Sequence, residues 1–148
     1  MNAIDTYADV IEAEGLIVKR YQDDDLRLSF RFEGDRYDLV TYSDDLSFVG
    51  ISARYGIPKG ISRTTATREA NAFTRRMKVI KATVTEDRGI VISGELFVAE
   101  PESLRPVFLR ILSVIDHTSG QIFVNFRTLA SKPKASSPAS RREASEVA

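Results

Sequence analysis

The chain contains few residues that could form a conventional catalytic centre. Among its 148 residues there is no cysteine, and His117 is the single histidine. A thiolate nucleophile and a cysteine-ligated zinc site are therefore excluded, and a serine triad or a multi-histidine metal centre would have at most one imidazole. His117 directly follows Asp116, and neighbouring side chains on a helix point about 100° apart, so these two do not form an acid–base pair. We interpret His117 as a surface or partly buried polar residue.

Two short motifs suggest ligand binding, but each has a simpler interpretation. Asp23-Asp24-Asp25 could attract a hard cation, yet it lacks the alternating ligands, central glycine and terminal glutamate of a calcium loop. The segment Gly56–Gly60 contains Lys59 but is not followed by the Lys-Ser/Thr pair of a phosphate-binding loop. We interpret the first as a solvated linker and the second as a connector. The sequence thus predicts no catalytic residue, no cofactor and no metal ligand.

Basic residues are densest between residues 68 and 81, where Arg75, Arg76 and Lys78 lie close together. Acidic side chains follow at residues 86 and 87, and no aromatic surface is interleaved for base stacking. The chain has 21 basic and 21 acidic side chains, a net charge of zero. A protein that binds nucleic acid or anionic membranes through a strong overall field is therefore excluded. Nucleic-acid binding through the helix predicted in this region and the C-terminal tail remains a minor alternative.

Hydrophobic periodicity predicts the elements that would position these residues. A three- and four-residue spacing predicts helices, and alternation of apolar and polar residues predicts strands. The predicted elements are a helix over 3–14, strands over 26–32, 36–42 and 46–55, a helix starting at Thr64 or Thr65, strands over 79–85 and 90–98, and a last helix with Ser103 as its N-cap and Pro106 in its first turn. The order α-βββ-α-ββ-α predicts an α+β fold, an antiparallel sheet with helices on one face. Gly120 would end or kink the last helix.

The first two long strands form a predicted hairpin around Gly34-Asp35, because both residues tolerate the positive φ of a two-residue loop. The register that follows pairs Glu33 with Arg36, Phe32 with Tyr37, Arg31 with Asp38 and Phe30 with Leu39. Both charge pairs would then be complementary, and the aromatic residues would share one face of the sheet.

Composition divides the chain near residue 129. Residues 1–129 have the length and apolar content of one domain. Residues 130–148 contain two prolines, no aromatic residue and Val147 as their one large aliphatic side chain, so we predict a disordered C-terminal tail. The N-terminus does not resemble a signal peptide, and no window reaches the roughly 18 apolar residues of a membrane-spanning helix. We therefore expect a cytoplasmic protein that does not associate with membranes.

A family resemblance covers residues 1–127 and is most specific between 68 and 98. The helical segment 68–76, the strand 78–85, the acidic turn 86–89 and the strand 90–96 resemble the YbjN family, described as bacterial sensory transduction regulators. Asn71, the aromatic character of Phe73 and Gly89 match the family pattern. The departures are Phe73 and Thr74, where the family often has tryptophan and a second asparagine, and residues 100–102, which replace a glycine-rich entry to the last helix. The resemblance implies a fold like that of class I type III secretion chaperones, and it implies no catalytic residues.

More apolar residues are present than a two-layer domain would obviously cover. Alternation places Val40, Tyr42, Val49 and Ile51 on the sheet face opposite Phe30, Leu39 and Phe48, and the last helix is apolar around much of its circumference. Two interpretations remain open: the helices cover this surface within one monomer, or part of it forms a homodimer interface or a groove for a partner. The resemblance favours the second, because it implies dimers that hold extended client segments.

Our leading hypothesis from the sequence is a non-enzymatic bacterial regulatory or chaperone-like protein that forms a homodimer and binds a protein client. The predicted interface comprises Val40, Tyr42, Val49, Ile51, Phe108 and Leu112. The alternative is a small-ligand-binding domain, or an enzyme using carboxylates and arginines in a cleft on the sheet, with Asp38, Arg54 and Glu95 as its polar groups.

Overall fold

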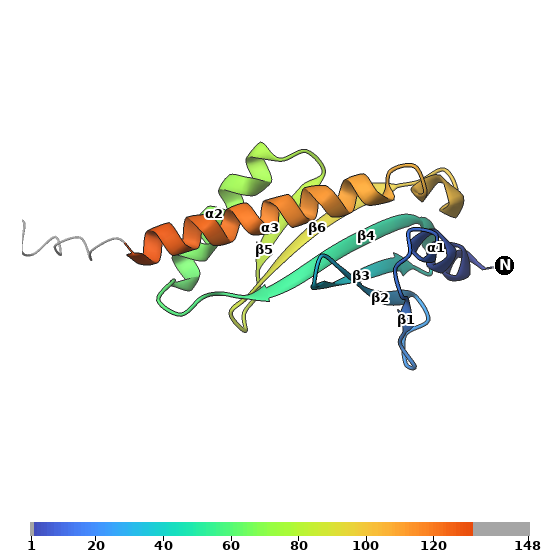
Figure 1. The fold of residues 1–148 in the computed structure, drawn as a ribbon, viewed down its shortest axis with the longest axis horizontal. Coiled ribbons are helices and arrows are strands. Elements are labelled where there is room, and N and C mark those ends of the chain that lie inside the picture. Colours follow the sequence, from blue (N-terminus) through green and yellow to red (C-terminus); the bar gives the residue numbers. More distant parts are fainter. Residues whose placement is uncertain (1, 132–148) are drawn as a thin grey trace, which may run out of the picture.

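The computed structural model describes residues 2–131 (Figure 1). Its elements are α1 (Ala3–Glu12), β1 (Lys19–Arg20), β2 (Arg27–Phe32), β3 (Asp35–Tyr42), β4 (Asp45–Gly56), α2 (Arg63–Arg76), β5 (Ile80–Val84), β6 (Gly89–Phe97), the 3-10 helix η1 (Pro101–Leu104) and α3 (Phe108–Ser131). The predicted tail lies outside the described residues, except for Ala130 and Ser131, which continue α3 two positions past the predicted boundary.

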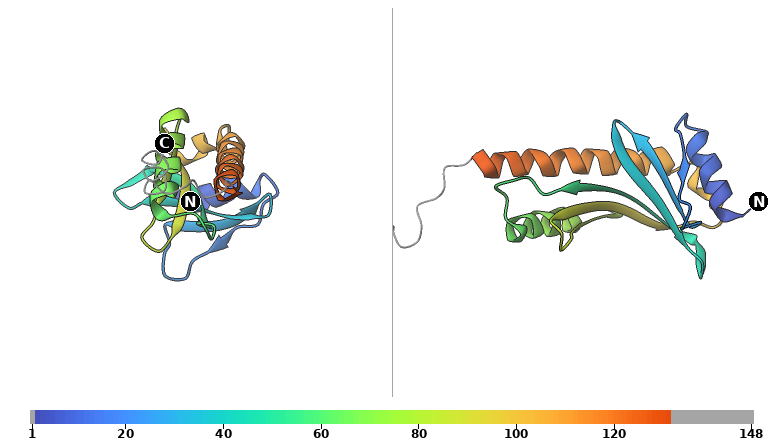
Figure 2. Two further views of the ribbon diagram at one scale, coloured as in Figure 1. Left: turned by 90° about the vertical axis from the view of Figure 1, so that its left-hand side faces the viewer. Right: turned by 90° about the horizontal axis from the view of Figure 1, so that it is seen from below.

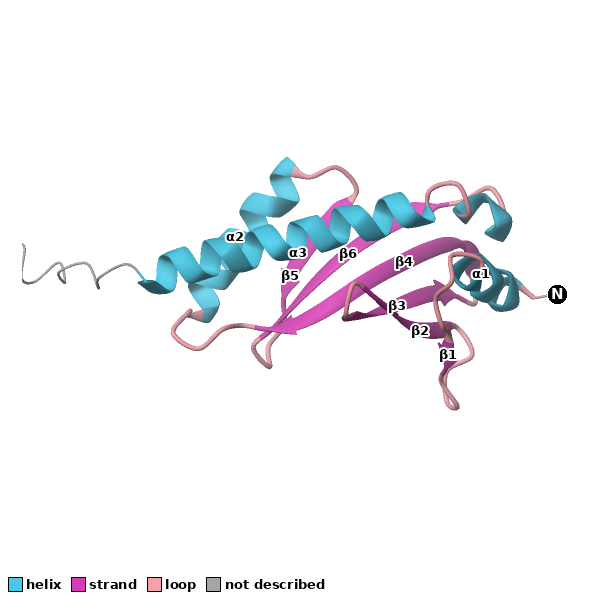
Figure 3. Cartoon of the chain, viewed as in Figure 1, coloured by secondary structure: helices cyan, strands magenta, loops and turns pink. Residues whose placement is uncertain are grey.

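The six strands form one antiparallel sheet in the order β1-β2-β3-β4-β6-β5. All three α-helices pack against one face of this sheet, with α3 running along β6 and β4 (Figures 1 and 2). This arrangement confirms the predicted fold class and the order of its principal elements. The sequence did not reveal β1, a two-residue edge strand, or η1, which lies between β6 and α3 (Figure 3).

Polar side chains fix the starts of the first two helices. Asn2 caps α1 by accepting a hydrogen bond from the Asp5 amide at 3.0 Å. Ser62 caps α2 in the same way by accepting from the Thr65 amide at 3.0 Å. The predicted cap at Thr64 or Thr65 is therefore two to three residues late, because the Ser62 hydroxyl takes that role.

The β2–β3 hairpin uses Glu33-Gly34 as its two-residue loop, one position earlier than predicted. Both loop residues have positive φ (51° and 83°), and such loops favour glycine at the second position. The predicted register is therefore wrong, and the observed partners are Phe32 and Asp35, Arg31 and Arg36, and Phe30 and Tyr37. The aromatic residues still share a face, and the Phe30 and Tyr37 rings stack with centroids 5.7 Å apart. The predicted charge complementarity is lost, because Arg31 faces another arginine.

The segment before the last helix also differs from the prediction. Ser103 lies inside η1, where its amide donates to the Glu100 carbonyl, and α3 begins only at Phe108. Pro106 therefore falls in the connection between the two helices. Gly120 neither ends nor kinks α3, which continues to Ser131.

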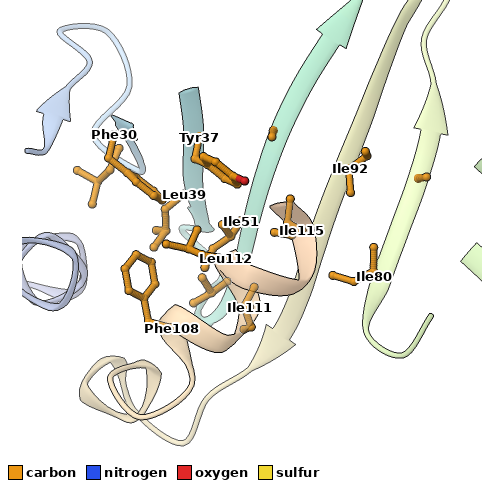
Figure 4. Close-up of a cluster of buried hydrophobic side chains, with 14 of the residues drawn as sticks. Phe30, Tyr37, Leu39, Ile51, Ile80, Ile92, Phe108, Ile111, Leu112 and Ile115 are labelled. Carbon is orange, nitrogen blue, oxygen red and sulfur yellow. The ribbon is translucent and has the colours of Figure 1, made fainter. Parts of the chain in front are cut away.

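The core fills the space between the sheet and the helices (Figure 4). Tyr37, Leu39, Ile51 and Ile92 project from three central strands toward Ile115 of α3, and all are fully buried. A register shift in β3 between Val40 and Tyr42 determines which residues of β4 face the helices and belong to this core. The β3–β4 turn pairs Tyr42 with Asp45, but beyond the shift Leu39 faces Ile51.

This shift overturns one prediction about the faces of the sheet. Continuing the turn register would pair Leu39 with Phe48, as the sequence pattern suggested. The observed displacement is an odd number of residues, so it exchanges the two faces of β4. Val49 and Ile51 therefore lie on the helix-covered face with Leu39, and Phe48 lies on the uncovered face.

Candidate partner-binding site

The six residues of the predicted interface lie in two different environments. Val49, Ile51, Phe108 and Leu112 are 0% exposed and belong to the core of the monomer. Their predicted role in a surface patch is corrected accordingly, since none of them reaches solvent. The other two, Val40 and Tyr42, come from β3 and are half-buried and exposed respectively.

Three aromatic side chains gather on the helix-free face of the sheet. We call Tyr42, Phe48 and Phe97 the open-face aromatic cluster. The ring centroids of Tyr42 and Phe48 lie 5.6 Å apart, and those of Phe48 and Phe97 lie 5.1 Å apart. Phe97 is 76% exposed and Tyr42 is 49% exposed. Large aromatic side chains exposed next to one another are typical of interaction surfaces.

Sequence reasoning missed Phe97, although β6 carried a signal. Ile90, Ile92 and Leu96 share one parity and face the helices, whereas Val91, Glu95 and Phe97 share the other. Phe97 is thus a large aromatic residue at a position that the alternation assigns to the outer face. Its contact with Phe48 could not be counted from the sequence, because it depends on how β4 and β6 pair.

The polar groups of the alternative hypothesis do not converge on one cleft. The Glu95 carboxylate accepts from the Lys81 ammonium at 3.0 Å. Arg54 donates to Asp87 at 2.5 Å, in the β5–β6 turn. Asp38 accepts from the Tyr21 hydroxyl at 2.7 Å. Each of the three groups therefore bonds to a different partner, and the three pairs lie at different places in the fold.

The pKa shifts in the structure have ordinary structural causes. Burial raises the pKa of Tyr37, and burial together with a hydrogen bond to Asp35 raises the pKa of Tyr55 to about 12. Both hydroxyls stay protonated at neutral pH and cannot serve as bases. Hydrogen bonds from Thr85 and Arg54 lower the pKa of Asp87, which keeps that carboxylate ionised.

A groove of about 620 Å³ opens between the end of α2 and the start of α3. We call it the α2–α3 groove. Its lining residues are Arg76, Met77, Lys78, Val79, Ile80, Leu96, Val107, Arg110, Ile111 and Val114. Seven of the ten are apolar, three are cationic, and none is acidic. The basic region found in the sequence therefore contributes Arg76 and Lys78 to the edge of an apolar hollow, whereas its Lys81 forms an ion pair with Glu95 on the sheet.

A second hollow, of about 640 Å³, lies beside β1 and the loop that precedes it. Its large apolar lining residues are Leu16, Ile17, Tyr21 and Phe30. Two of its cations already have acidic partners, since Arg20 contacts Asp5 at 2.8 Å and Arg36 lies 3.9 Å from Asp38. The charge in this hollow is therefore partly compensated within the protein.

The other motifs from the sequence have structural roles. Asp24 of the acidic run accepts a hydrogen bond from the Leu26 amide at 3.0 Å, at the entry to β2. The Gly56–Gly60 connector is tied to the β5–β6 turn by a bond from the Ile57 amide to the Arg88 carbonyl. His117 is exposed on α3. Within residues 2–131, no three His, Cys, Asp or Glu side chains are placed to hold a metal ion, and no helix is long and apolar enough to span a membrane.

These features define the chain as an α+β protein whose antiparallel sheet is covered by helices on one face. Apolar side chains are exposed both on the helix-free face of the sheet and beside the helices.

Solved structures share this fold. An uncharacterised protein from Methanothermobacter thermautotrophicus matches with a TM-score of 0.64 and 7% identity, over 88% of this chain and 100% of that one. YbjN from E. coli, a candidate transcription regulator, matches with a TM-score of 0.60 and 11% identity, over 84% and 91%.

A type III secretion chaperone shares the fold as well. SycH from Yersinia pestis, solved in complex with a stable fragment of YscM2, matches with a TM-score of 0.51 and 15% identity, over 80% of this chain and 98% of that one. No protein-family model and no curated protein matches the sequence. The chain therefore has the fold shared by YbjN and type III secretion chaperones, and these identities support likeness of fold alone.

Proposed function

We propose that this chain is a YbjN-like, non-enzymatic bacterial protein of the cytoplasm that acts as a regulator or chaperone, forms a homodimer and binds a protein partner. The observation that carries the proposal is the open-face aromatic cluster. Two of the solved structures that share the fold of the chain are a candidate regulator and a chaperone in complex with a protein fragment, which supports a binding role.

The cluster suits contact with a second copy of the chain. In a twofold dimer the same patch meets itself, so its members must be compatible with their own copies. Aromatic rings satisfy this requirement, because offset or edge-to-face packing between like rings is favourable. The nearby Lys81–Glu95 ion pair carries both signs of charge on the same face, so it does not repel its own copy.

The dimer is tested by sedimentation equilibrium of the full chain at tens of micromolar. We expect a dimer mass for the native sequence and a monomer mass for Phe97→Asp, with an unchanged circular dichroism spectrum. Thr83→Asp is the matched control, since Thr83 is an exposed residue on the same face that lies outside the cluster. A native chain that is strictly monomeric at these concentrations would refute the dimer.

The second candidate function, binding of a small anionic amphiphile, is favoured by one observation. The α2–α3 groove has the volume of a small-molecule site and combines apolar walls with cations. Isothermal titration with dodecanoate tests it. Saturable binding of one equivalent, lost in Arg110→Glu, would support this function.

A further inference from the structure

The cations around the α2–α3 groove have no acidic partners within the part of the chain that the structure describes. Six ion pairs are present there, and Arg76, Lys78 and Arg110 take part in none of them. Arg76 packs over the Phe73 ring instead, with its guanidinium 4.6 Å from the centroid. The three cations come from α2, the α2–β5 connection and α3. A single carboxylate would neutralise one of them, whereas several spaced carboxylates could neutralise all three.

Val79 is held in a backbone conformation that its side chain disfavours. Its φ is +71°, in the left-handed region, and its side chain is 61% exposed at the groove. A β-branched residue in this region is a genuine outlier, which costs about 1–3 kcal/mol, and glycine or asparagine would relieve the strain. The chain nevertheless presents an apolar side chain to solvent at this position. Strained residues of this kind cluster at active sites, ligand clamps and switch regions.

The α3 wall of the groove has helical spacing. Val107 directly precedes α3, and its carbonyl accepts from the Ile111 amide. Val107, Ile111 and Val114 follow one another at steps of four and three residues, so they form one stripe, and Arg110 lies beside it. Leu96 of β6 and Ile80 of β5 supply apolar surface on the sheet side. An amphipathic helix binds such a surface by placing its own residues i, i+3, i+4 and i+7 in the groove.

We propose that the α2–α3 groove binds an acidic amphipathic helix of a protein partner. Apolar side chains of that helix would pack against Val79, Ile111 and Val114, and its carboxylates would pair with Arg76, Lys78 and Arg110. The chain's own residues 132–148 do not match this chemistry, because they carry four basic and two acidic side chains. A nucleic acid is also disfavoured, because the lining contains no aromatic ring on which a base could stack.

This inference rests on the proposed partner-binding function, and it is tested with a defined probe. The probe is a fluorescein-labelled 18-residue peptide with leucine at positions i, i+3, i+4 and i+7 and glutamate on its other face. A second peptide replaces every glutamate by lysine. Fluorescence anisotropy with the full chain measures binding of both, and dodecanoate serves as a competitor.

Three variants locate the site. Val79→Asn removes the apolar side chain while relieving the strain, Arg110→Glu reverses one cation, and Arg127→Glu is the matched control on the same helix outside the groove. We expect the acidic peptide to bind, and we expect about tenfold weaker binding for each groove variant, the loss for one buried valine or one charge pair. Arg127→Glu should bind as the native chain does, and Val79→Asn should melt at the same temperature or higher.

Four results would overturn the inference: the acidic peptide does not bind, the lysine peptide binds equally well, Val79→Asn binds as the native chain does, or dodecanoate binds and the acidic peptide does not.

Sedimentation distinguishes failure of the groove proposal from failure of the dimer proposal. Val79→Asn should leave the dimer mass unchanged, and Phe97→Asp should leave peptide affinity unchanged. The groove and the dimer can therefore succeed or fail independently.

Discussion

The hydroxyl of Thr74 in α2 bonds both backbone groups of Ala82 on the outer edge of β5. It accepts from the Ala82 amide at 3.0 Å and donates to the Ala82 carbonyl at 3.3 Å. Because β5 is the last strand of the sheet, these groups would otherwise be free to pair with another chain. Thr74 therefore protects the edge strand β5.

Thr74→Val should destabilise the fold, because it keeps the shape of the side chain but removes both hydrogen bonds. We expect a loss of about 1–2 kcal/mol in the free energy of unfolding, measured in urea. Thr74→Asn should restore most of this loss, since an amide can both donate and accept. Thr83→Val is the control in the same strand, where the side chain makes no hydrogen bond within residues 2–131. Equal stability of the two valine variants would contradict this role of Thr74.

Gly94 allows α3 to approach the sheet closely. A Cβ atom at this position would lie 3.0 Å from Cγ2 of Ile111 and 3.5 Å from Cδ1 of Ile80. Gly94→Ala should therefore cost about 1–3 kcal/mol, because the helix must shift or Ile111 must leave its rotamer. Gly50→Ala is the matched control, since its Cβ would meet only Glu95 at an ordinary 3.9 Å.

Thermal unfolding followed by circular dichroism compares these two alanine variants. Adding Ile111→Leu, which has no Cγ2 methyl, to Gly94→Ala should recover part of the lost stability if the contact with Cγ2 is responsible. A native-like melting temperature for Gly94→Ala would show that α3 is not packed this closely.

Helices and strands could be predicted from periodicity because their apolar stripes are local in the sequence. The faces of β4 could not, because an irregularity near Val40 shifts the register by an odd number of residues. The α2–α3 groove could not be predicted from the sequence either. Its lining comes from three separated segments, and one lining residue, Val79, has a left-handed φ. Four of the six interface residues predicted from the sequence belong to the core, because burial depends on the register of β4 and on the packing of α3.

The exchanged faces of β4 predict opposite results for two aspartate substitutions. Val49→Asp places a charge in the core, because Val49 is 0% exposed, and should cost more than about 4 kcal/mol or prevent folding. Tyr42→Asp lies on the open face and should change the stability of the monomer, measured below the concentration at which it dimerises, by less than about 1 kcal/mol. Urea unfolding compares them. If both variants fold with equal stability, Val49 lies on the surface and the assignment of the β4 faces is wrong.

The β2–β3 register is tested by Arg31→Glu. In the structure Arg31 faces Arg36, so the substitution replaces a repulsive pair by an attractive one and should stabilise the fold by about 0.2–1 kcal/mol. In the register predicted from the sequence, Arg31 would face Asp38, and the same substitution would destabilise. The sign of the change in unfolding free energy therefore distinguishes the two registers.

Tyr55 should make stability depend on alkaline pH. Its hydroxyl donates to Asp35 at 2.9 Å, and burial is the main reason that its pKa rises to about 12 in the folded protein. An unfolded tyrosine ionises near pH 10, so between pH 10 and 12 the unfolded chain releases a proton that the folded chain retains. The stabilisation from Tyr55 is therefore complete below pH 10 and is lost as the pH rises through 12.

We expect the native chain to exceed Tyr55→Phe in unfolding free energy by about 1–2 kcal/mol near pH 8, and this difference should vanish by pH 12. Asp35→Asn should move the ionisation of Tyr55 toward lower pH, because it removes the negative charge beside the phenol. Phenolate absorbance follows the ionisation, and urea unfolding at each pH follows stability. A difference that stays constant from pH 8 to 12 would contradict the raised pKa of Tyr55. The predicted decline would support burial of this phenol, whose ring packs against Phe123 of α3 with centroids 5.2 Å apart.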